Sequence, residues 1–316
     1  MILPRAPASL LLAGFIVFLV ITFGKLSGHN LLTREIQNSL HTVVFAVFTY
    51  FALHLMHRRT GDSHTSSANY LLVAGLCLLT GIAAEAAQWL TGRGFGLLDI
   101  VRDMAGIALG AGFHALGART TQGSRLVPRK RWRHALAAAL CIILCTAMYP
   151  LASLSWHYLG RNAAFPVIMD MQADWAAAFL RLDAARLTPA PDTCGPAFSA
   201  LQLLRAHYPG IHIVDPSHDW RGYRYLSIEL HSANPKPVNL SLRVHDRTHN
   251  NEYSDRFNRI LTVAPGTRRY RIALQDISNA PTGRRLDLGN IAGVILFSGK
   301  HPHPQKLCVG VIRLEQ

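Results

Sequence analysis

The chain has 316 residues, a hydrophobic content of 50% and a formal net charge of +14. Its length leaves room for two domains. Residues 1–157 are dominated by long apolar runs, whereas residues 158–316 alternate polar and apolar residues with frequent Pro and Gly. These properties exclude a single soluble globular domain and predict a membrane domain (1–157) followed by a domain of another class (158–316).

Five apolar runs in the first domain are each near the length that crosses the hydrocarbon of a bilayer. They cover residues 8–23, 41–56, 69–90, 97–116 and 135–154. No small-x-small cleavage site follows the first run, so we expect a retained span and not a signal peptide. The sequence therefore predicts an α-helical transmembrane bundle of five spans.

The positive charge is concentrated in the loop between the fourth and fifth runs. The basic residues of this loop are Arg119, Arg125, Arg129, Lys130, Arg131 and Arg133. Basic residues in short loops stay in the cytoplasm, and Arg5 and Arg58 fall on the same side if the spans alternate. We therefore expect a multi-pass protein of the cell inner membrane with a cytoplasmic N-terminus and a periplasmic second domain. The loop can also contact anionic lipid of the bilayer, and we expect no nucleic-acid partner.

Ionisable side chains accumulate at the adjoining ends of the third and fourth runs. Because such groups are costly at a membrane boundary, they mark a candidate working site. Glu85 and Gln88 are three residues apart, and Asp99 and Asp103 are four apart, so each pair shares one helical face. Arg93 lies in the short loop between them. Charges of both signs can therefore converge there.

This pattern resembles the VanZ-like family of small bacterial membrane proteins over about residues 10–118. The matching positions are Glu85, Gln88, Arg93, Asp99, Gly106 and Gly110, and His41 fits an upstream His of the family. Asp103 stands where the family usually has Asn, and Asn38 stands where a Lys often precedes the His. The resemblance implies a cell-envelope role associated with glycopeptide (teicoplanin-type) antibiotic resistance, without an agreed biochemical activity.

We predict one binding cluster at the outer ends of these helices. Its members are His41, Glu85, Gln88, Arg93, Asp99 and Asp103. One hypothesis is that the cluster grips the head group of a lipid-linked cell-wall precursor. The alternative is a membrane enzyme that acts on a polyprenyl-linked or phospholipid head group, with Glu85 or Asp99 as general base. An architectural alternative pairs Asp99 with Arg93 or Arg102 near a helix N-terminus. Enzymatic activity is therefore left open, and no cofactor or metal is predicted.

The second domain contains short runs with period-two alternation, which is typical of an antiparallel β-sandwich. The predicted strands cover residues 223–231, 239–245, 258–263, 268–274, 291–297 and 307–314. Residues 174–187 are predicted to form one amphipathic helix. Several phrases, such as Asp219-Trp220-Arg-Gly-Tyr223, resemble the galactose-binding-like jelly rolls of carbohydrate-binding modules. The resemblance implies an extracytoplasmic jelly roll.

A glycan site is predicted around residues 246–258 of this domain. The candidate residues are Trp220, Asp246, Asn251, Tyr253, Asp255 and Arg256. Amides, carboxylates, an aromatic ring and a guanidinium are groups that bind sugar hydroxyls, and Arg256 suits an anionic sugar. A solvated hairpin loop, a core position for Trp220 and a calcium site are the alternatives.

Two cysteines fall in the second domain. Cys194 and Cys308 are its only pair, and the expected compartment is oxidising, so they are predicted to form a disulfide. Cys77, Cys141 and Cys145 lie in apolar runs and are expected to serve as small packing residues.

Overall fold

The structure is a computed structural model that describes residues 30–59, 67–90, 96–117, 127, 129–189, 194–217, 219–299 and 305–316. The chain divides into two compact units, Met1–Ser153 and Leu154–Gln316. The first predicted span, residues 8–23, lies outside the described residues.

Four of the predicted apolar runs form helices. These are α2 (Leu31–Arg59), α3 (Ser67–Leu90), α4 (Leu97–Gly117) and α5 (Lys130–Ala164). Among the described residues, three helical stretches are long and apolar enough to cross a membrane: Leu31–His57, Ser67–Ala87 and Lys130–Ala164. The prediction of five spans is thus reduced to three candidate spans in this part of the chain. Helix α4 is not one of them, and it carries Asp99, Arg102 and Asp103 within its first two turns.

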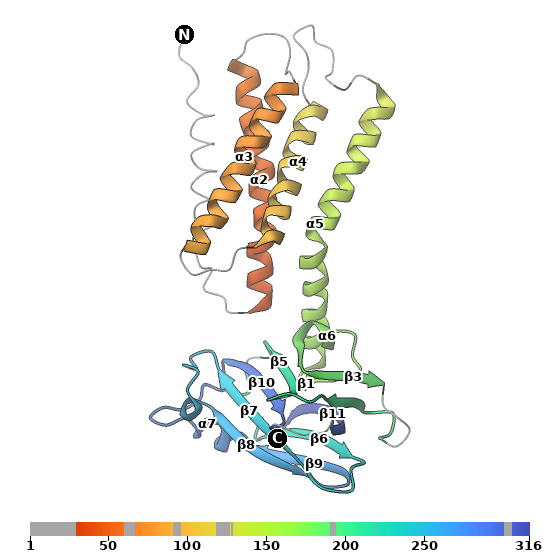
Figure 1. Cartoon of the computed structure of the whole chain (residues 1–316), viewed down its shortest axis with the longest axis vertical. Coiled ribbons are helices and arrows are strands. Elements are labelled where there is room, and N and C mark those ends of the chain that lie inside the picture. The colour runs from red at the N-terminus through yellow and green to blue at the C-terminus, as the bar shows by residue number, and fades with distance from the viewer. Residues whose placement is uncertain are drawn as a thin grey trace. The chain divides into compact units, whose positions relative to one another are not determined.

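Helices α2, α3 and α4 lie side by side in the N-terminal unit (Figure 1). Gly106 and Gly110 let α4 approach α2 closely: a Cβ on Gly106 would lie 2.4 Å from the Thr42 carbonyl oxygen, and one on Gly110 would lie 2.3 Å from that of Ala46. The two glycines are four residues apart and therefore share one helical face. Small residues at this spacing allow the backbones of membrane helices to pack together.

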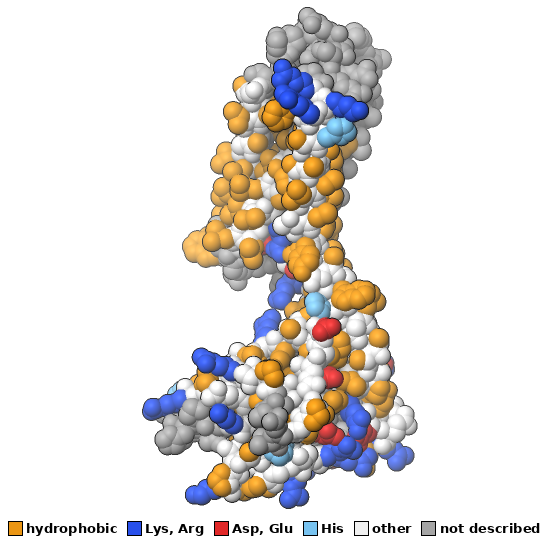
Figure 2. Space-filling model, turned by 90° about the vertical axis from the view of Figure 1, so that its right-hand side faces the viewer, with side chains coloured by type: hydrophobic (Ala, Val, Ile, Leu, Met, Phe, Trp, Pro, Cys, Tyr) orange, Lys and Arg blue, Asp and Glu red, His pale blue; other side chains and the backbone are white. Residues whose placement is uncertain are grey.

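The outer surface of the helices is apolar. Figure 2 shows hydrophobic side chains along the helices and Lys and Arg side chains gathered at one end of them. Leu71, Leu97 and Leu98 are each at least 70% exposed. Exposed apolar surface on this scale is unfavourable in water and marks contact with lipid or a partner.

The C-terminal unit is an antiparallel β-sandwich of two sheets. One sheet has the strand order β3-β4-β11-β6-β9, with β1 paired to β11, and the other has the order β2-β5-β10-β7-β8. The strands are β1 (Val167–Met169), β2 (Leu180–Asp183), β3 (Ala185–Pro189), β4 (Ser199–Leu203), β5 (Gly210–Val214), β6 (Tyr225–Ser232), β7 (Val238–Asp246), β8 (Phe257–Val263), β9 (Gly266–Ala273), β10 (Ile291–Phe297) and β11 (Gln305–Glu315). Short helices α6 (Ala176–Phe179), η1 (Tyr253–Asp255) and α7 (Leu274–Ser278) complete the unit.

Period-two alternation positions the sandwich core. In β7, Leu240, Leu242 and Val244 are fully buried, while the residues between them face outward, as the pleat of a strand requires. All six strands predicted from this alternation are present as β6 to β11.

The prediction of one helix over residues 174–187 is wrong. Only α6 (Ala176–Phe179) is helical there, and the chain then forms β2 and β3. Leu180 pairs with Ile213 of β5, and Leu187 pairs with Leu201 of β4. Pairing with distant strands therefore overrides the local helical pattern.

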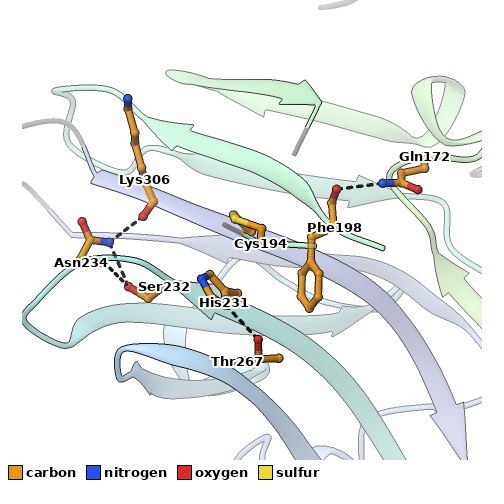
Figure 3. Close-up of a disulfide and its surroundings, with 9 residues drawn as sticks. Gln172, Cys194, Phe198, His231, Ser232, Asn234, Thr267 and Lys306 are labelled. Carbon is orange, nitrogen blue, oxygen red and sulfur yellow. Dashed lines mark hydrogen bonds between the residues drawn. A yellow bond between two sulfur atoms is a disulfide. The ribbon is translucent and has the colours of Figure 1, made fainter. Parts of the chain in front are cut away.

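A disulfide joins Cys194 to Cys308, the pair that the sequence singled out, with a Cα–Cα distance of 6.3 Å. The two sulfurs are buried beside Phe198. Figure 3 shows this region, where the Gln172 side-chain amide donates a hydrogen bond to the Phe198 carbonyl oxygen at 2.9 Å. The disulfide connects the loop before β4, which contains Cys194, to β11, which contains Cys308.

Candidate functional site

A groove of about 530 Å³ lies on the outward side of the sheet β2-β5-β10-β7-β8. Its lining residues are Asp183, Tyr208, Gly210, Ser241, Arg243, Tyr253, Arg256, Ile295 and Phe297. The strand register brings them together, because Phe297 of β10 pairs with Gly210 on one side and with Ser241 on the other. Ile295 likewise pairs with Arg243. The inward neighbours Leu242 and Leu296 belong to the core.

Three aromatic rings line this groove. Tyr208, from the loop before β5, is 67% exposed, and Tyr253, from η1, is 71% exposed. Phe297 supports the first ring edge to face, with ring centroids 5.8 Å apart. An exposed tyrosine offers a flat apolar surface together with a polar hydroxyl. The groove can therefore stack a ring that carries hydroxyl groups.

Two guanidinium groups line the same groove. Arg256 lies over the Tyr253 ring, 5.2 Å from its centroid, and its Nε donates a hydrogen bond to Asn258 at 3.1 Å. Arg243 Nη2 donates to His249 Nε2 at 3.0 Å, whereas its buried Nε has no partner among the described residues. Burial, followed by the charge of Arg256, lowers the pKa of Arg243.

Behind the groove, Arg284 binds two predicted site residues, Asp246 and Asp255. Its Nη1 and Nη2 donate to the Asp246 carboxylate at 2.6 and 2.9 Å, and its Nε donates to Asp255 Oδ1. Burial opposes ionisation of Asp246, but its hydrogen bonds with Arg284 hold the pKa of Asp246 below its usual range. Both carboxylates are therefore occupied inside the protein, and the sequence prediction that they contact sugar is not matched by this geometry.

His249 connects these carboxylates to the groove. Its Nδ1 donates to the Asp255 carbonyl oxygen at 2.9 Å, and its Nε2 accepts the hydrogen bond from Arg243. Because a guanidinium can only donate, His249 Nε2 is the acceptor of this hydrogen bond and Nδ1 is the donor to Asp255. Arg284, Asp255 and His249 thus form a chain of contacts that positions Arg243.

A strip of imidazoles borders the groove. The ring centroids of His212 and His245 are 6.1 Å apart, and those of His245 and His249 are 5.3 Å apart. Burial, with the nearby charge of Arg243, lowers the pKa of His245 to about 3, so this imidazole is neutral at ordinary pH. No group of three His, Cys, Asp or Glu side chains in the described part of the chain is arranged to hold a metal ion.

The remaining sandwich candidates do not line the groove. Trp220 is fully buried, and its indole Nε1 donates to the Ser217 carbonyl oxygen at 2.7 Å, so its ring is a core element and not a stacking platform. Asn251 is exposed in a turn and has a left-handed φ of 74°. Of the predicted residues, Tyr253 and Arg256 line the groove.

Sequence reasoning missed Tyr208, Arg243 and Phe297. Arg243 occupies an outward position of a predicted strand, and Phe297 ends another, so their alternation was a usable signal. Tyr208 precedes β5, which the sequence analysis did not predict.

His41, Glu85, Asp99 and Asp103, which were predicted to form one polar cluster in the helical unit, lie within electrostatic range of one another and form three hydrogen-bonded groups. His41 Nδ1 lies 3.2 Å from Asp103 Oδ1. Glu85 is 1% exposed, and its Oε2 accepts a hydrogen bond from the Gly96 amide at 3.0 Å, while its Oε1 has no described partner. Arg93 and the side chain of Gln88 lie outside the described residues.

Asp99 belongs to the third group. Its carboxylate accepts a hydrogen bond from Arg102 at 2.7 Å, and Arg102 also binds Glu35 of α2 at 3.2 Å. This pairing matches the architectural alternative for Asp99. Glu35 lies near the start of α2, far from Arg102 in the sequence. No local sequence pattern therefore predicted that the two residues pair.

No family model matches the chain, so the VanZ-like resemblance stays a prediction, and no curated protein matches it either. The sandwich is similar to a family 11 carbohydrate-binding module from Clostridium thermocellum in complex with a β-1,3-1,4-mixed-linked tetrasaccharide. The identity is 13% over 47% of this chain and 94% of that chain, with a TM-score of 0.37.

Two further solved structures are similar. One is an exo-β-agarase, with 19% identity over 47% of this chain and 24% of that chain and a TM-score of 0.39. The other is a module, TmCBM61, in complex with β-1,4-galactotriose, with 11% identity over 43% of this chain and 88% of that chain and a TM-score of 0.29. This chain spans about a quarter of the agarase. TM-scores this low support no conclusion about a ligand. The case for a ligand therefore depends on the residues of the groove.

Proposed function

We propose that the chain is a membrane-anchored glycan-binding protein whose sandwich groove holds a saccharide of the cell envelope. The observation that carries this proposal is the groove itself, in which the exposed rings of Tyr208 and Tyr253 flank strand-borne polar groups. Ligand sites are concave, with apolar surface for contact and a few polar groups for orientation. A saccharide, with hydroxyl groups on a ring that has apolar faces, suits this combination.

The helical unit supplies the anchor in this proposal. Its three candidate spans support membrane insertion, and the basic residues from Arg129 to Arg133 at the start of α5 support a cytoplasmic position for that end. The sandwich then lies outside the inner membrane, in the periplasm. The Cys194–Cys308 disulfide is compatible with that oxidising compartment.

Replacing Tyr253 with Ala should weaken saccharide binding about tenfold, because one stacking surface is lost. Tyr208→Ala should act in the same direction from the other part of the groove. The measurement is calorimetric titration of the full-length protein in detergent with a panel of neutral and acidic oligosaccharides.

Tyr270→Ala is the matched control, since Tyr270 belongs to β9 of the opposite sheet. Its binding should equal that of the unaltered protein. If no oligosaccharide binds the unaltered protein, or if all three variants bind alike, the groove is not a glycan site.

A second candidate function is a membrane enzyme that acts on a lipid-linked head group. The observation that favours it is Glu85, a carboxylate that is 1% exposed and has an oxygen without a described partner. An intramembrane ionisable group of this kind is a functional-site hypothesis.

This candidate predicts turnover of a polyprenyl-linked cell-wall precursor that Glu85→Gln abolishes, measured by chromatography of the extracted lipids. Asp99→Asn serves as the comparison, because Asp99 is engaged by Arg102. Absence of product with the unaltered protein would leave Glu85 as a structural or binding group.

A further inference from the structure

The groove contains more positive charge than its own residues neutralise. Arg243 and Arg256 both line it, and the charge of Arg256 is felt at Arg243. Neither guanidinium forms an ion pair with a carboxylate among the described residues; their polar partners are His249 and Asn258. Like charges brought together without a counter-charge are unfavourable. The protein keeps this arrangement although it pairs other arginines with acids, such as Arg284 with Asp246.

The nearby acids cannot supply the missing charge. Asp255, the nearest acid to His249, is engaged by Arg284. Among the described residues, Asp183 is the only carboxylate that lines the groove, but it lies on β2, three strand spacings from Arg243 on β7. At about 4.8 Å per spacing these strands are about 14 Å apart, which exceeds the screening length of roughly 8 Å at physiological ionic strength. Histidine side chains carry no negative charge, so the nearby imidazoles of His245 and His249 cannot offset the charge of the two arginines.

We propose that the groove takes an acidic saccharide, whose carboxylate or sulfate group lies between Arg243 and Arg256 while its ring stacks on Tyr253. This inference depends on the proposed glycan function and names its substrate class. The planar fork of a guanidinium matches both anions, and its hydrogen bonds to them are charge-assisted. Arg243 and Arg256 both line the groove, so each can turn guanidinium N–H groups toward the anion.

The positions of the two cations fit this role. Arg256 lies over the Tyr253 ring, so a sugar stacked beside that ring places its acidic substituent near the guanidinium. Arg243 is held from behind by His249, which leaves its remaining donors for a ligand. Ser241, one outward position along β7, adds a hydroxyl group to the same row.

The test compares matched oligosaccharides on the full-length protein in detergent, by calorimetric titration. The probes are a galacturonic-acid tetramer, its carboxyl-reduced neutral tetramer of the same linkage, and a sulfated galactose tetramer. The unaltered protein should bind at least one acidic probe about tenfold or more tightly than the neutral one. The two acidic arms distinguish a carboxylate from a sulfate ligand.

Arg256→Gln should remove most of this preference while neutral-probe binding changes little, and Arg243→Gln should do the same. Arg268→Gln, which removes an exposed positive charge from β9 of the other sheet, is the charge-matched control and should keep the preference. Arg256→Lys should restore it in part, because the charge returns without the planar fork.

Equal binding of acidic and neutral probes by the unaltered protein would overturn the acidic ligand and leave the glycan function intact. Absence of binding to every oligosaccharide would overturn both. An equal loss of preference in Arg268→Gln and Arg256→Gln would show that the overall charge of the protein, and not the groove, selects the anion.

Discussion

Replacing Arg284 with Leu should lower the free energy of unfolding of the sandwich by about 3–5 kcal/mol. Arg284 is the bidentate partner of Asp246, whose side chain is fully buried, and it also binds Asp255. Its removal leaves a buried carboxylate without a counter-charge, which is among the costliest single changes in a protein. Chemical denaturation followed by circular dichroism measures the loss.

Arg285→Leu is the matched control, since Arg285 is the exposed neighbour, and its stability should change little. The deficit of Arg284→Leu should begin to shrink while the pH is still above about 4, the ordinary pKa of Asp, because burial without a counter-charge raises the pKa of Asp246 in the variant. In the unaltered protein the pKa of Asp246 is depressed, so the stability that this group contributes is present above its unfolded-state pKa and is lost as the pH falls. A deficit that is the same at pH 3 and pH 7 would contradict the assignment.

Cys194→Ser should lower the melting temperature of the sandwich by roughly 10–20 °C. The disulfide closes a segment with a sequence separation of 114 residues. Loop-closure entropy for a segment of that size corresponds to about 4–5 kcal/mol. The measurement is thermal unfolding with and without a thiol reductant.

The reductant should shift the unaltered protein toward the Cys194→Ser value and leave that variant unchanged. Cys141→Ser, which alters a free and exposed cysteine of α5, should have no comparable effect. A melting temperature that is insensitive to reductant would show that the bond contributes little to the stability of the sandwich.

Local sequence patterns predicted strands β6 to β11 because each has at least seven residues, and β7 alternates between buried and more exposed residues over its whole length. Strands β2 to β5 have only four or five residues each and escaped prediction. These short segments become strands because they pair with strands that lie far away in the sequence, as the pairing of Leu180 with Ile213 shows. The same dependence explains the incorrect helix over residues 174–187.

The sequence predicted only part of the site, because the remaining contacts join residues that are distant in the sequence. Tyr253 and Arg256 lie in the loop that the sequence marked, and both line the groove. Asp246 and Asp255 carry carboxylates of the kind that can bind sugar hydroxyls, but both accept hydrogen bonds from Arg284. Arg284 follows Asp255 by 29 residues. No local pattern reveals that partnership. Tyr208 joins the groove only because β5 pairs with β10, which is information carried by strand register.

The contact between His249 and Arg243 has a kinetic consequence. A free arginine side chain loses about 1.5–2 kcal/mol of conformational entropy when a ligand orders it, but Arg243 has already been ordered within the protein. Preorganisation of this kind strengthens a complex mainly by slowing its dissociation. The association rate constant should instead fall as the ionic strength of the medium rises. The groove should therefore distinguish one saccharide from another by how long each remains bound.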